Sequence, residues 1–386
     1  MNRPFRILGL GTALPTHHIV QTEAASFAET CLAGQGGEAR RSSTLVQALY
    51  RRSGVKTRHS VVLNSSTNGT AATQDFYWPS DTEQDLGPGT AARMLRYETE
   101  SPLLAHDAAS RAMEESGVRA DQVTHLVTVS CSGFSAPGFD LSLIDSLGLS
   151  PRTARTHVGF MGCHGALNGL RVAAAFASSD PNAVVLVCAV EICTLHHQYG
   201  WDPQRIVANS LFADGAAAVV GRAADSKHTS SSDETSESGG HATGPSLAVI
   251  AHDCCVIPDT REMMTWRIAD HGFQMSLSPE VPDVITRQLA PVLIAFLARH
   301  QLTIEQVGSW AVHPGGPRIL KAVADVAGLT DEQLAPSLGI LERCGNMSSP
   351  TVLFIIDELR RRSAPMPCVV MGFGPGLNVE IALINH

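Results

Sequence analysis

The sequence contains few charged residues and no long runs of Lys or Arg. Only 17% of its residues are charged, and 28 basic against 37 acidic side chains leave a formal charge of −9. Proteins that bind nucleic acids use clusters of Lys and Arg to neutralise phosphates. The charge distribution therefore argues against nucleic acid as a partner.

Cysteine pairs of the CxxC type are also missing. The nine cysteines are an odd number and stand scattered among apolar runs, as at Cys188, Cys193, Cys254 and Cys368. This pattern favours reduced thiols and a cytoplasmic location over a disulfide framework. We also expect no metal site.

The opening residues MNRPFRILGLGTALP have too short an apolar part for a secretory signal. A transmembrane helix needs an uninterrupted apolar stretch of about 18 residues or more, and none is evident further along the chain. We therefore expect no membrane span.

The length instead indicates a large core. A chain of 386 residues, 44% of them hydrophobic, suggests two domains or one duplicated unit. Residues 225–244, DSKHTSSSDETSESGGHATG, are almost free of apolar side chains, which is typical of a mobile surface loop. We therefore expect an N-terminal half at 1–235 and a C-terminal half at 236–386.

Both halves alternate strand-like and helix-like patterns, which predicts an α/β architecture. HLVTVSCS, AVVLVCAVE, SWAVHP and PCVVMGFGPG read as strands, as do residues 216–221 and 246–257 on either side of the polar segment. SPLLAHDAASRAMEESG, DVITRQLAPVLIAFLARH and TVLFIIDELRRR read as helices. Periodicity alone leaves a duplication unproven.

Cys163 is the first candidate catalytic residue. In GFMGCHGALNGLRVAAAFAS it lies between two glycines, after an apolar stretch and at the start of an amphipathic helix. Glycines permit a tight turn and close substrate approach, and a helix N-terminus favours a thiolate. The alternative is a small buried core cysteine.

Two further candidates stand at turns. His313 in AVHPGGPRIL ends a strand and enters a turn, a position that displays catalytic side chains well. Asn346 in RCGNMSSPTVLFIIDELRRR lies just before a helix that Ser348 or Ser349 could cap. Taken alone, Asn346 is more typical of a turn former than of a catalytic amide.

The segments GNMSSPTVLFIIDELRR, HPGGPRIL, LFADGAAAVV and GFGPGLNVEIALI resemble the chalcone synthase family of type III polyketide synthases, from about residue 5 to the C-terminus. The resemblance implies a thiolase-like fold, a duplicated five-layered αβαβα architecture, and a homodimer. It also implies a Cys-His-Asn active site at Cys163, His313 and Asn346. The substrates would be an acyl-CoA starter and malonyl-CoA, with no cofactor.

These residue types suit that chemistry. A thiolate at Cys163, paired with a protonated His313, can take the acyl group from a starter thioester. N–H donors of His313 and Asn346 can then stabilise the enolate formed when malonyl-CoA loses CO₂. The enolate attacks the thioester in a Claisen step, and repeated cycles give a chain that cyclises.

The resemblance carries over to cavity residues one by one. Phe212 resembles the phenylalanine that gates the CoA tunnel, although a core aromatic is an equal alternative. Met275 stands where a second gating phenylalanine is expected and would make the gate more pliable. The remaining cavity positions, with departures from plant members, are Cys131, Cys193 and His196 in place of threonine and Trp266 in place of glycine.

Two further assignments follow from the same comparison. Ser348 matches the family's serine beside the catalytic asparagine, which influences cyclisation in some members, although it could merely cap the helix. Arg51, Arg52, Lys56 and Arg58 form a basic stretch that would meet CoA phosphates, with a solvated surface as the alternative.

The changed cavity favours a fatty acyl starter, and products of the alkylpyrone or alkylresorcinol type, over an aromatic coumaroyl starter. Three other functions are alternatives to a type III polyketide synthase: a ketoacyl synthase III, a papain-like cysteine hydrolase and a non-catalytic thiolase-fold binding protein. The HPGG turn at His313 disfavours the first, and the condensing motifs disfavour the second. The presence of all three triad residues disfavours the third.

Overall fold

The computed structural model describes residues 3–32, 39–80, 82–224 and 247–386, which form a mixed α/β protein as predicted. The strands are β1 Phe5–Ala13, β2 His18–Val20, β3 Thr57–His59, β4 His125–Ser130, β5 Ala154–Gly159, β6 Val184–Ile192, β7 Asp214–Ala223, β8 Leu247–Val256, β9 Met264–Ala269, β10 Gly272–Leu277, β11 Ser309–Val312, β12 Cys368–Gly374 and β13 Asn378–Asn385. The strands predicted at 216–221 and 246–257 correspond to β7 and β8.

The α-helices are α1 Gln21–Thr30, α2 Ala39–Arg52, α3 Thr90–Ser116, α4 Phe139–Leu147, α5 Gly165–Ser179, α6 Pro203–Leu211, α7 Val281–Arg299, α8 Pro317–Ala327, α9 Asp331–Cys344 and α10 Thr351–Arg361. Short 3₁₀ helices are η1 Ala120–Gln122, η2 Gly162–His164, η3 Cys193–His196 and η4 Ile304–Gln306. The predicted helices correspond to α3, α7 and α10.

Sheet topology shows the duplication that periodicity could not establish. Within the described residues the main sheet has the order β11-β12-β13-β8-β1-β7-β6-β4-β5. In each half a parallel pair is followed by two antiparallel pairings: β4, β6, β7 and β1 in the first, β11, β12, β13 and β8 in the second. The two halves meet where β1 pairs with β8.

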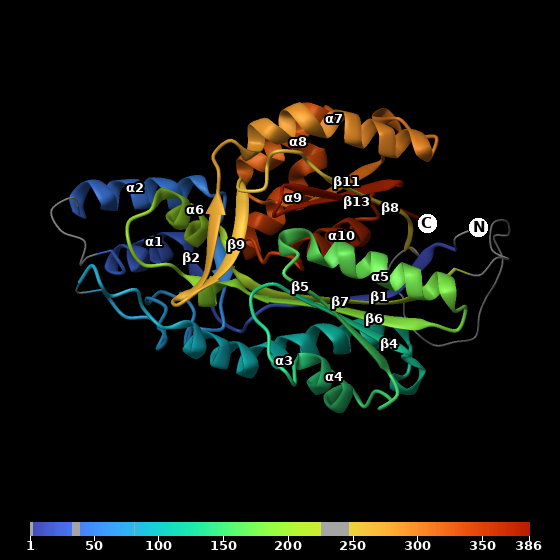
Figure 1. Ribbon diagram of the computed structural model, residues 1–386, viewed down its shortest axis with the longest axis horizontal. Helices are drawn as coiled ribbons and strands as arrows, with labels where there is room; N and C mark the ends of the chain where they lie inside the picture. The colour runs from blue at the N-terminus through green and yellow to red at the C-terminus, as the bar shows by residue number, and fades with distance from the viewer. Residues whose placement is uncertain (1–2, 33–38, 81, 225–246) are drawn as a thin grey trace.

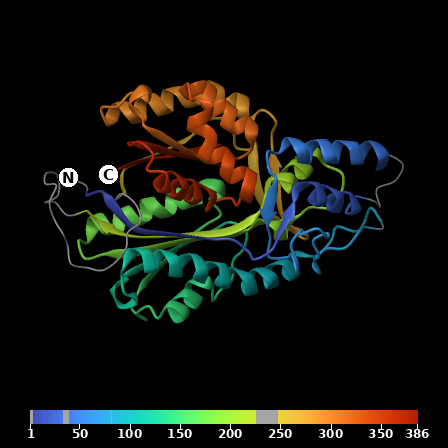
Figure 2. The same cartoon turned by 180° about the vertical axis from the view of Figure 1, so that it is seen from behind.

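The halves stack into five layers, as the resemblance implied. Figure 1 shows α7 and α8 above the strands of the second half, α5 and α10 in the middle, the strands of the first half next, and α3 and α4 at the bottom. The same layers are visible from behind in Figure 2. The middle layer packs through apolar side chains, and Leu167, Leu170, Val352 and Leu353 have no exposed surface. This buried layer fixes the loops that precede α5 and α10.

Two expectations fall partly or wholly outside the described residues. The predicted surface loop and the boundary between 1–235 and 236–386 both lie in 225–246. Although no membrane span is expected, α7 is long and apolar enough by composition to cross a membrane. In the fold, Ile285, Leu289 and Leu293 of α7 are fully buried against the core, so α7 is an outer-layer helix.

Helix α10 begins differently from the prediction. Its N-cap is Pro350, with no side-chain cap, so the expected capping by Ser348 or Ser349 was wrong. The Ser349 hydroxyl instead donates to the Glu191 carboxylate at 2.7 Å. Ser348 adopts a left-handed conformation with φ of 55°. Both serines belong to a buried loop whose polar groups have partners elsewhere.

Candidate active site

Cys163 lies in η2, the tight turn between the loop after β5 and helix α5. Gly162 has φ of +74°, and a Cβ there would come within 2.5 Å of Pro375, so this position requires glycine. The Cys163 side chain is buried, with 7% exposed. The turn therefore fixes the thiol at the edge of the middle layer.

Asn346 is fixed by backbone bonds to the segment around Phe212. The Asn346 N–H donates to the Leu211 carbonyl at 2.9 Å, and the Ala213 N–H donates to the Asn346 carbonyl at 2.9 Å. The Asn346 side-chain oxygen accepts from the Ser348 N–H at 2.8 Å. This bond occupies the amide oxygen and leaves the amide N–H groups as donors.

The thiol and the asparagine lie together. Hydrogen bonds from the Ser348 and Asn346 side chains favour ionisation of Cys163, which places all three groups at one point. Ser348 also lies 3.3 Å from the Cys131 sulfur, measured from Oγ to Sγ. The residues predicted on separate segments as nucleophile, amide donor and neighbouring serine thus meet in the fold.

His313 follows β11 and is anchored by its backbone, since its N–H donates to the Met371 carbonyl at 2.8 Å. Only 1% of the residue is exposed. Among the described residues, neither ring nitrogen has a hydrogen-bond partner. A buried imidazole with two unpaired nitrogens is costly unless a ligand completes it.

Burial opposes charge at both catalytic side chains. It raises the pKa of Cys163 to about 12, with the Glu191 carboxylate as a further raising cause. It lowers the pKa of His313 to about 3, and His164 lowers it further. Burial thus opposes the thiolate that the helix N-terminus is expected to favour, and it opposes a positive charge on His313 in the same way.

Glu191 was missed by the sequence analysis. It ends the apolar strand β6 and is fully buried. Its carboxylate accepts from the backbone of Cys131 and Ser132 at 3.0 to 3.1 Å, from the Ser132 hydroxyl at 2.6 Å and from Ser349 at 2.7 Å. A lone Glu within the apolar segment VVLVCAVEI was the signal available in the sequence. The Glu191 side chain joins the ends of β4 and β6 to the loop before α10.

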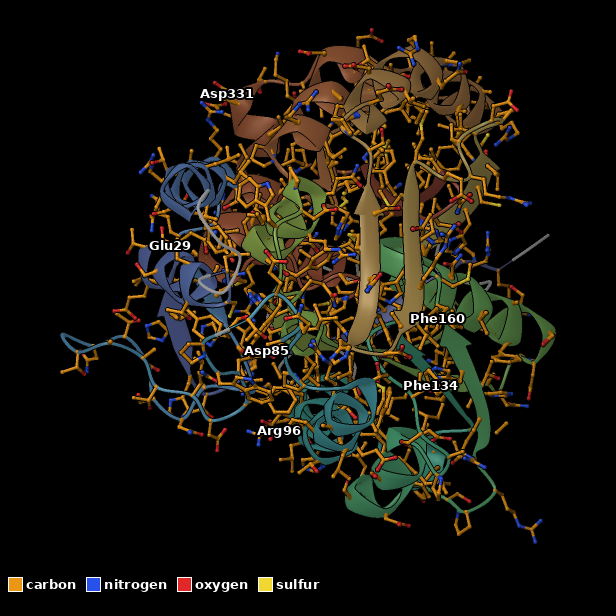
Figure 3. All side chains as sticks on the ribbon, turned by 60° about the vertical axis from the view of Figure 1, so that its left-hand side comes forward. Glu29, Asp85, Arg96, Phe134, Phe160 and Asp331 are labelled. Carbon is orange, nitrogen blue, oxygen red and sulfur yellow. The ribbon has the colours of Figure 1, made fainter. Side chains whose placement is uncertain are left out.

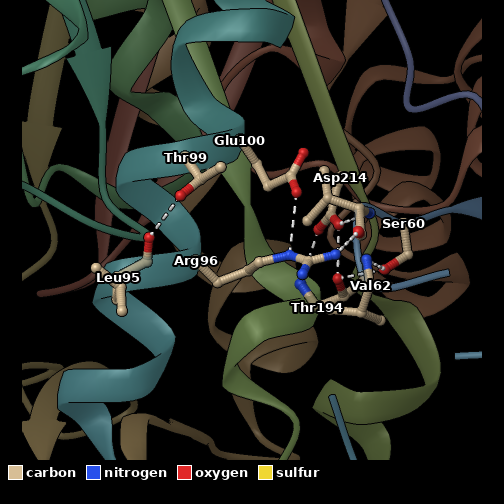
Figure 4. A network of polar contacts seen from close by, with 9 residues as sticks. Ser60, Val62, Leu95, Arg96, Thr99, Glu100, Thr194 and Asp214 are labelled. Atoms are coloured by element: carbon tan, nitrogen blue, oxygen red, sulfur yellow. Dashed lines mark hydrogen bonds and ion pairs between the residues drawn. The ribbon is translucent and has the colours of Figure 1, made fainter. Parts of the chain in front are cut away.

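A second buried carboxylate, Asp214 in LFADGAAAVV, organises the neighbouring wall. It accepts from the N–H of Val61 at 2.9 Å, from the N–H of Thr194 at 2.8 Å and from the Thr194 hydroxyl at 2.6 Å. Figure 4 shows this cluster with Ser60, and with Arg96 reaching it from α3. The cluster fixes η3 against the segment after β3.

A cavity of about 300 Å³ is lined by Phe212, whose backbone forms a bridge with Asn346. Its wall includes Phe212, Met275, Cys193, His196 and Trp266, five of the predicted substrate-binding residues. Cys131 and Ser348 do not line it and lie beside Cys163 instead. Cys163, His313 and Asn346 are also absent from its wall.

Three aromatic rings make part of this wall rigid. His196 stacks on Phe273 with ring centroids 4.2 Å apart, and Trp266 meets His196 edge to face at 5.2 Å. The Trp266 ring N–H donates to the Cys131 carbonyl at 2.7 Å, and the His196 Nε2 lies 2.6 Å from the Ser132 carbonyl oxygen. Trp266 and His196 are therefore tied to the loop after β4.

The four basic residues do not form one group: Arg51 and Lys56 line the same cavity, whereas Arg58 is inside the fold. Arg51 and Arg52 are exposed at the end of α2, and Lys56 is exposed and paired with Glu342. Arg58 is buried, donates to the Phe212 carbonyl at 3.0 Å and lies over the Tyr50 ring at 5.3 Å. Arg58 thus supports the backbone of Phe212 from inside the fold.

Comparison with known proteins decides the family. A model of chalcone and stilbene synthases, N-terminal domain, matches residues 2–225, and a model of the C-terminal domain matches residues 249–386. The chain belongs to the chalcone and stilbene synthase family. It is therefore an acyltransferase of the type III polyketide synthase class with a thiolase-like fold.

Relatives of this chalcone and stilbene synthase family member include bacterial enzymes. The chain is 30% identical to 1,3,6,8-tetrahydroxynaphthalene synthase of Streptomyces peucetius subsp. caesius, over 100% of this chain and 94% of the relative. It is also 30% identical to the alpha-pyrone synthesis polyketide synthase-like Pks18 of Mycobacterium tuberculosis, over 98% of this chain and 90% of the relative.

Solved structures of type III polyketide synthases agree with this family assignment. The crystal structure of PKS-I from the brown alga Ectocarpus siliculosus superposes with a TM-score of 0.88 at 27% identity, covering 100% of this chain and 99% of that chain. The C-terminal type III polyketide synthase domain of Steely1 from Dictyostelium gives 0.84 at 25% identity, with 100% and 99% covered. Family membership favours polyketide synthesis over the ketoacyl synthase III, papain-like and non-catalytic alternatives.

Proposed function

We propose that this enzyme loads a fatty acyl group from acyl-CoA onto Cys163 and extends it with malonyl-CoA to an alkylpyrone or alkylresorcinol. The observation that carries the proposal is the buried meeting point of Cys163, Asn346 and Ser348. His313 is buried with both ring nitrogens unpaired, so it is available to move a proton and to donate to substrate. CoA thioesters supply the reactive groups, and no cofactor is needed.

Loading starts from a neutral Cys163 thiol and a neutral His313 imidazole. Cys163 gives its proton to His313, and the resulting thiolate attacks the thioester carbonyl of the starter. The sulfur–carbon bond to Cys163 forms, the bond to CoA sulfur breaks, and the CoA thiolate leaves with the proton that His313 returns. Burial makes the ion pair short-lived, which suits a site in which substrate must be present before charge separates.

In the extension step, His313 and Asn346 stabilise the negative charge of an enolate. Malonyl-CoA loses CO₂, and the electron pair of the broken bond forms an enolate whose oxygen accepts from His313 and Asn346. The enolate carbon then attacks the carbonyl of the Cys163 thioester, and the Cys163 sulfur leaves as a thiolate. Because the Asn346 oxygen is occupied by the Ser348 N–H, its amide nitrogen is the group that can face the enolate.

Asn346→Asp will test this step. The carboxylate can still accept from the Ser348 N–H but has no N–H to donate, so malonyl-CoA decarboxylation should fall by about 10² to 10³-fold, as for loss of one oxyanion-hole donor. CO₂ release measures it, and thermal unfolding checks the fold. Acylation of Cys163 by the starter should persist. An unchanged decarboxylation rate would contradict the assignment.

The cavity supports an acyl chain as the starter. Beyond Trp266 and Met275, its wall includes the apolar side chains of Ile19, Phe27 and Leu63. An apolar lining of this kind fits methylene groups better than a polar ring. Phe212 and Met275 are part of the wall, and a methionine side chain there can adapt to chains of different length. Pks18, one relative, is named for alpha-pyrone synthesis.

Incubation of the purified protein with malonyl-CoA and acyl-CoA starters, from acetyl to long-chain and coumaroyl, tests the function. Products are identified by mass analysis beside a Cys163→Ala control. Pyrone or resorcinol masses from fatty starters support the proposal, whereas products from coumaroyl-CoA alone would move the enzyme to the aromatic class. No consumption of malonyl-CoA with any starter would overturn it.

Trp266→Ala should change starter choice. Removing the indole enlarges the cavity and breaks the bond to the Cys131 carbonyl, so discrimination between short and bulky starters should shift by about tenfold or more. Ratios of kcat/KM across the starter panel measure it. Trp78→Ala is the matched control, because Trp78 is 47% exposed and lies outside the cavity wall. Equal ratios in both variants would contradict a specificity role.

We further propose that Arg51, Arg52 and Lys56 bind CoA phosphates, with Arg58 positioning Phe212. Arg51 and Lys56 line a second cavity of about 350 Å³ at the start of α1, where helix N–H groups favour anions.

We also propose that the protein is a cytoplasmic homodimer and that each subunit consists of two halves, 1–235 and 236–386. Phe134 and Phe160, 52% and 38% exposed with rings 6.1 Å apart near β5, support a covered surface (Figure 3).

A further inference from the structure

His164 is a second buried imidazole beside the catalytic residues. It follows Cys163 and is 2% exposed. Gly374 leaves room for it, because a Cβ there would lie 2.2 Å from the His164 ring. His313 bonds through its backbone to Met371, three residues before Gly374, so both histidines flank the same end of β12. Charge on His164 disfavours charge on His313.

Two asparagines satisfy both nitrogens of the His164 ring. Nδ1 lies 2.7 Å from the Asn168 side-chain oxygen, and Nε2 lies 3.2 Å from the Asn378 side-chain nitrogen. The same Asn378 nitrogen donates to the Glu380 carboxylate at 3.4 Å. A carboxylate only accepts, so Glu380 fixes which end of the Asn378 amide faces His164.

Glu380 is itself held in place. It is fully buried and paired with Arg171 at 2.7 Å; burial raises the pKa of Glu380, and the Arg171 charge opposes that rise. With the Asn378 amide oriented, Asn378 donates to Nε2, and the proton of the ring is on Nδ1 and is donated to the Asn168 oxygen. The titratable and charged groups around this network are Cys163 in η2, Arg171 on α5, His252 on β8, His313 after β11 and Glu380 on β13.

We infer that His164 is a positioning residue, held in its neutral Nδ1–H form by the Asn378 N–H that Glu380 orients, so that no second positive charge opposes proton transfer from Cys163 to His313. The inference rests on the proposed function of the Cys163–His313 pair. A proton on Nε2 would face the Asn378 N–H, and the two hydrogens would repel. Burial and the Arg171 charge also lower the pKa of His164, in the same direction.

Asn378→Ala removes the lock while leaving His164 in place. Asn378 is partly exposed at the start of β13, so the substitution should be tolerated. The readout is the rate of Cys163 alkylation by iodoacetamide, followed by mass spectrometry from about pH 5 to about pH 9, a range that brackets the ordinary imidazole pKa of about 6.5. Alkylation needs no malonyl-CoA, so it can succeed or fail independently of polyketide synthesis.

The wild-type profile should show no ionisation of His164. In Asn378→Ala an added ionisation should appear below pH 6.5, because burial and Arg171 still lower the pKa of His164, with alkylation falling by up to about tenfold for each pH unit below that ionisation. Asn378→Ala/His164→Gln should lose that added ionisation, because glutamine keeps hydrogen-bonding capacity and never titrates. A single-variant profile parallel to wild type would overturn the inference. So would an added ionisation that persists in the double variant.

If Asn378→Ala proves unstable, Asn378→Asp tests the same bond of the ring. A carboxylate only accepts, so it favours a proton on Nε2 and should produce the same added ionisation, again absent when His164 is glutamine. A change in activity with an unchanged pH profile in both variants would mark a purely structural role and overturn the inference.

Discussion

Replacement of Cys163 by alanine will abolish polyketide formation, whatever starter is supplied. Cys163 is the proposed covalent carrier of the acyl chain, so the loss should exceed the loss of any single hydrogen-bond donor, about 10⁶-fold in the case of a serine hydrolase nucleophile. Mass spectrometry after incubation with acyl-CoA should show an acyl adduct in wild type and none in Cys163→Ala.

Two neighbouring thiols provide matched controls. Cys131 and Cys193 are buried near Cys163, and their pKa values are raised by burial and by Glu191. Cys131→Ala and Cys193→Ala should retain the adduct on Cys163, with changes limited to rate or product. An adduct mapped to either of these cysteines in Cys163→Ala, with turnover retained, would contradict the assignment of the nucleophile.

Acidification below about pH 6 will destabilise the fold steeply, because many histidines are buried neutral. In the described part of the chain, burial lowers the pKa of seven: His59, His157, His164, His196, His197, His252 and His313. For His196, His197 and His313 it falls to about 3. Their stabilisation is complete above the unfolded pKa of about 6.5 and is lost as pH falls.

Each histidine that stays neutral at pH 4.5 lowers the free energy of unfolding by about 3 kcal/mol, because the unfolded chain takes up a proton. Several such terms approach the whole stability of an ordinary protein, about 5–15 kcal/mol. Buried carboxyls act in the opposite direction: burial raises the pKa of Asp214 to about 6, which favours the fold as pH falls and offsets part of the loss. Urea unfolding across pH measures the balance.

His252→Gln isolates one contribution. Burial lowers the pKa of His252 to about 4, and neither ring nitrogen has a partner among the described residues. Its replacement should raise stability at pH 4.5 by about 2 kcal/mol relative to pH 8. Exposed His300, at the end of α7, gives the control variant His300→Gln. An equal pH slope in wild type and His252→Gln would contradict the mechanism.

The sequence located Cys163, His313 and Asn346 through local signals. Glycines around Cys163 and the turn after His313 are short-range features, and long family motifs connected them. The same signals did not contain the effect of burial on the pKa of these side chains. The helix start at Cys163 predicted a thiolate, whereas packing around η2 raises its pKa to about 12. Desolvation depends on every neighbour of the thiol, and no sequence window contains them all.

By itself, the sequence determined the α/β class and the family and named the candidate reacting groups, because alternating patterns and spaced motifs are present along the chain. Only the tertiary structure decided which groups meet. Glu191 joins three segments, Arg58 turned inward to support Phe212, and His164 meets Asn378, 214 residues away in the sequence. Such contacts arise when the two halves of the sheet close on the middle layer, so their energies depend on distances that the chain order does not encode.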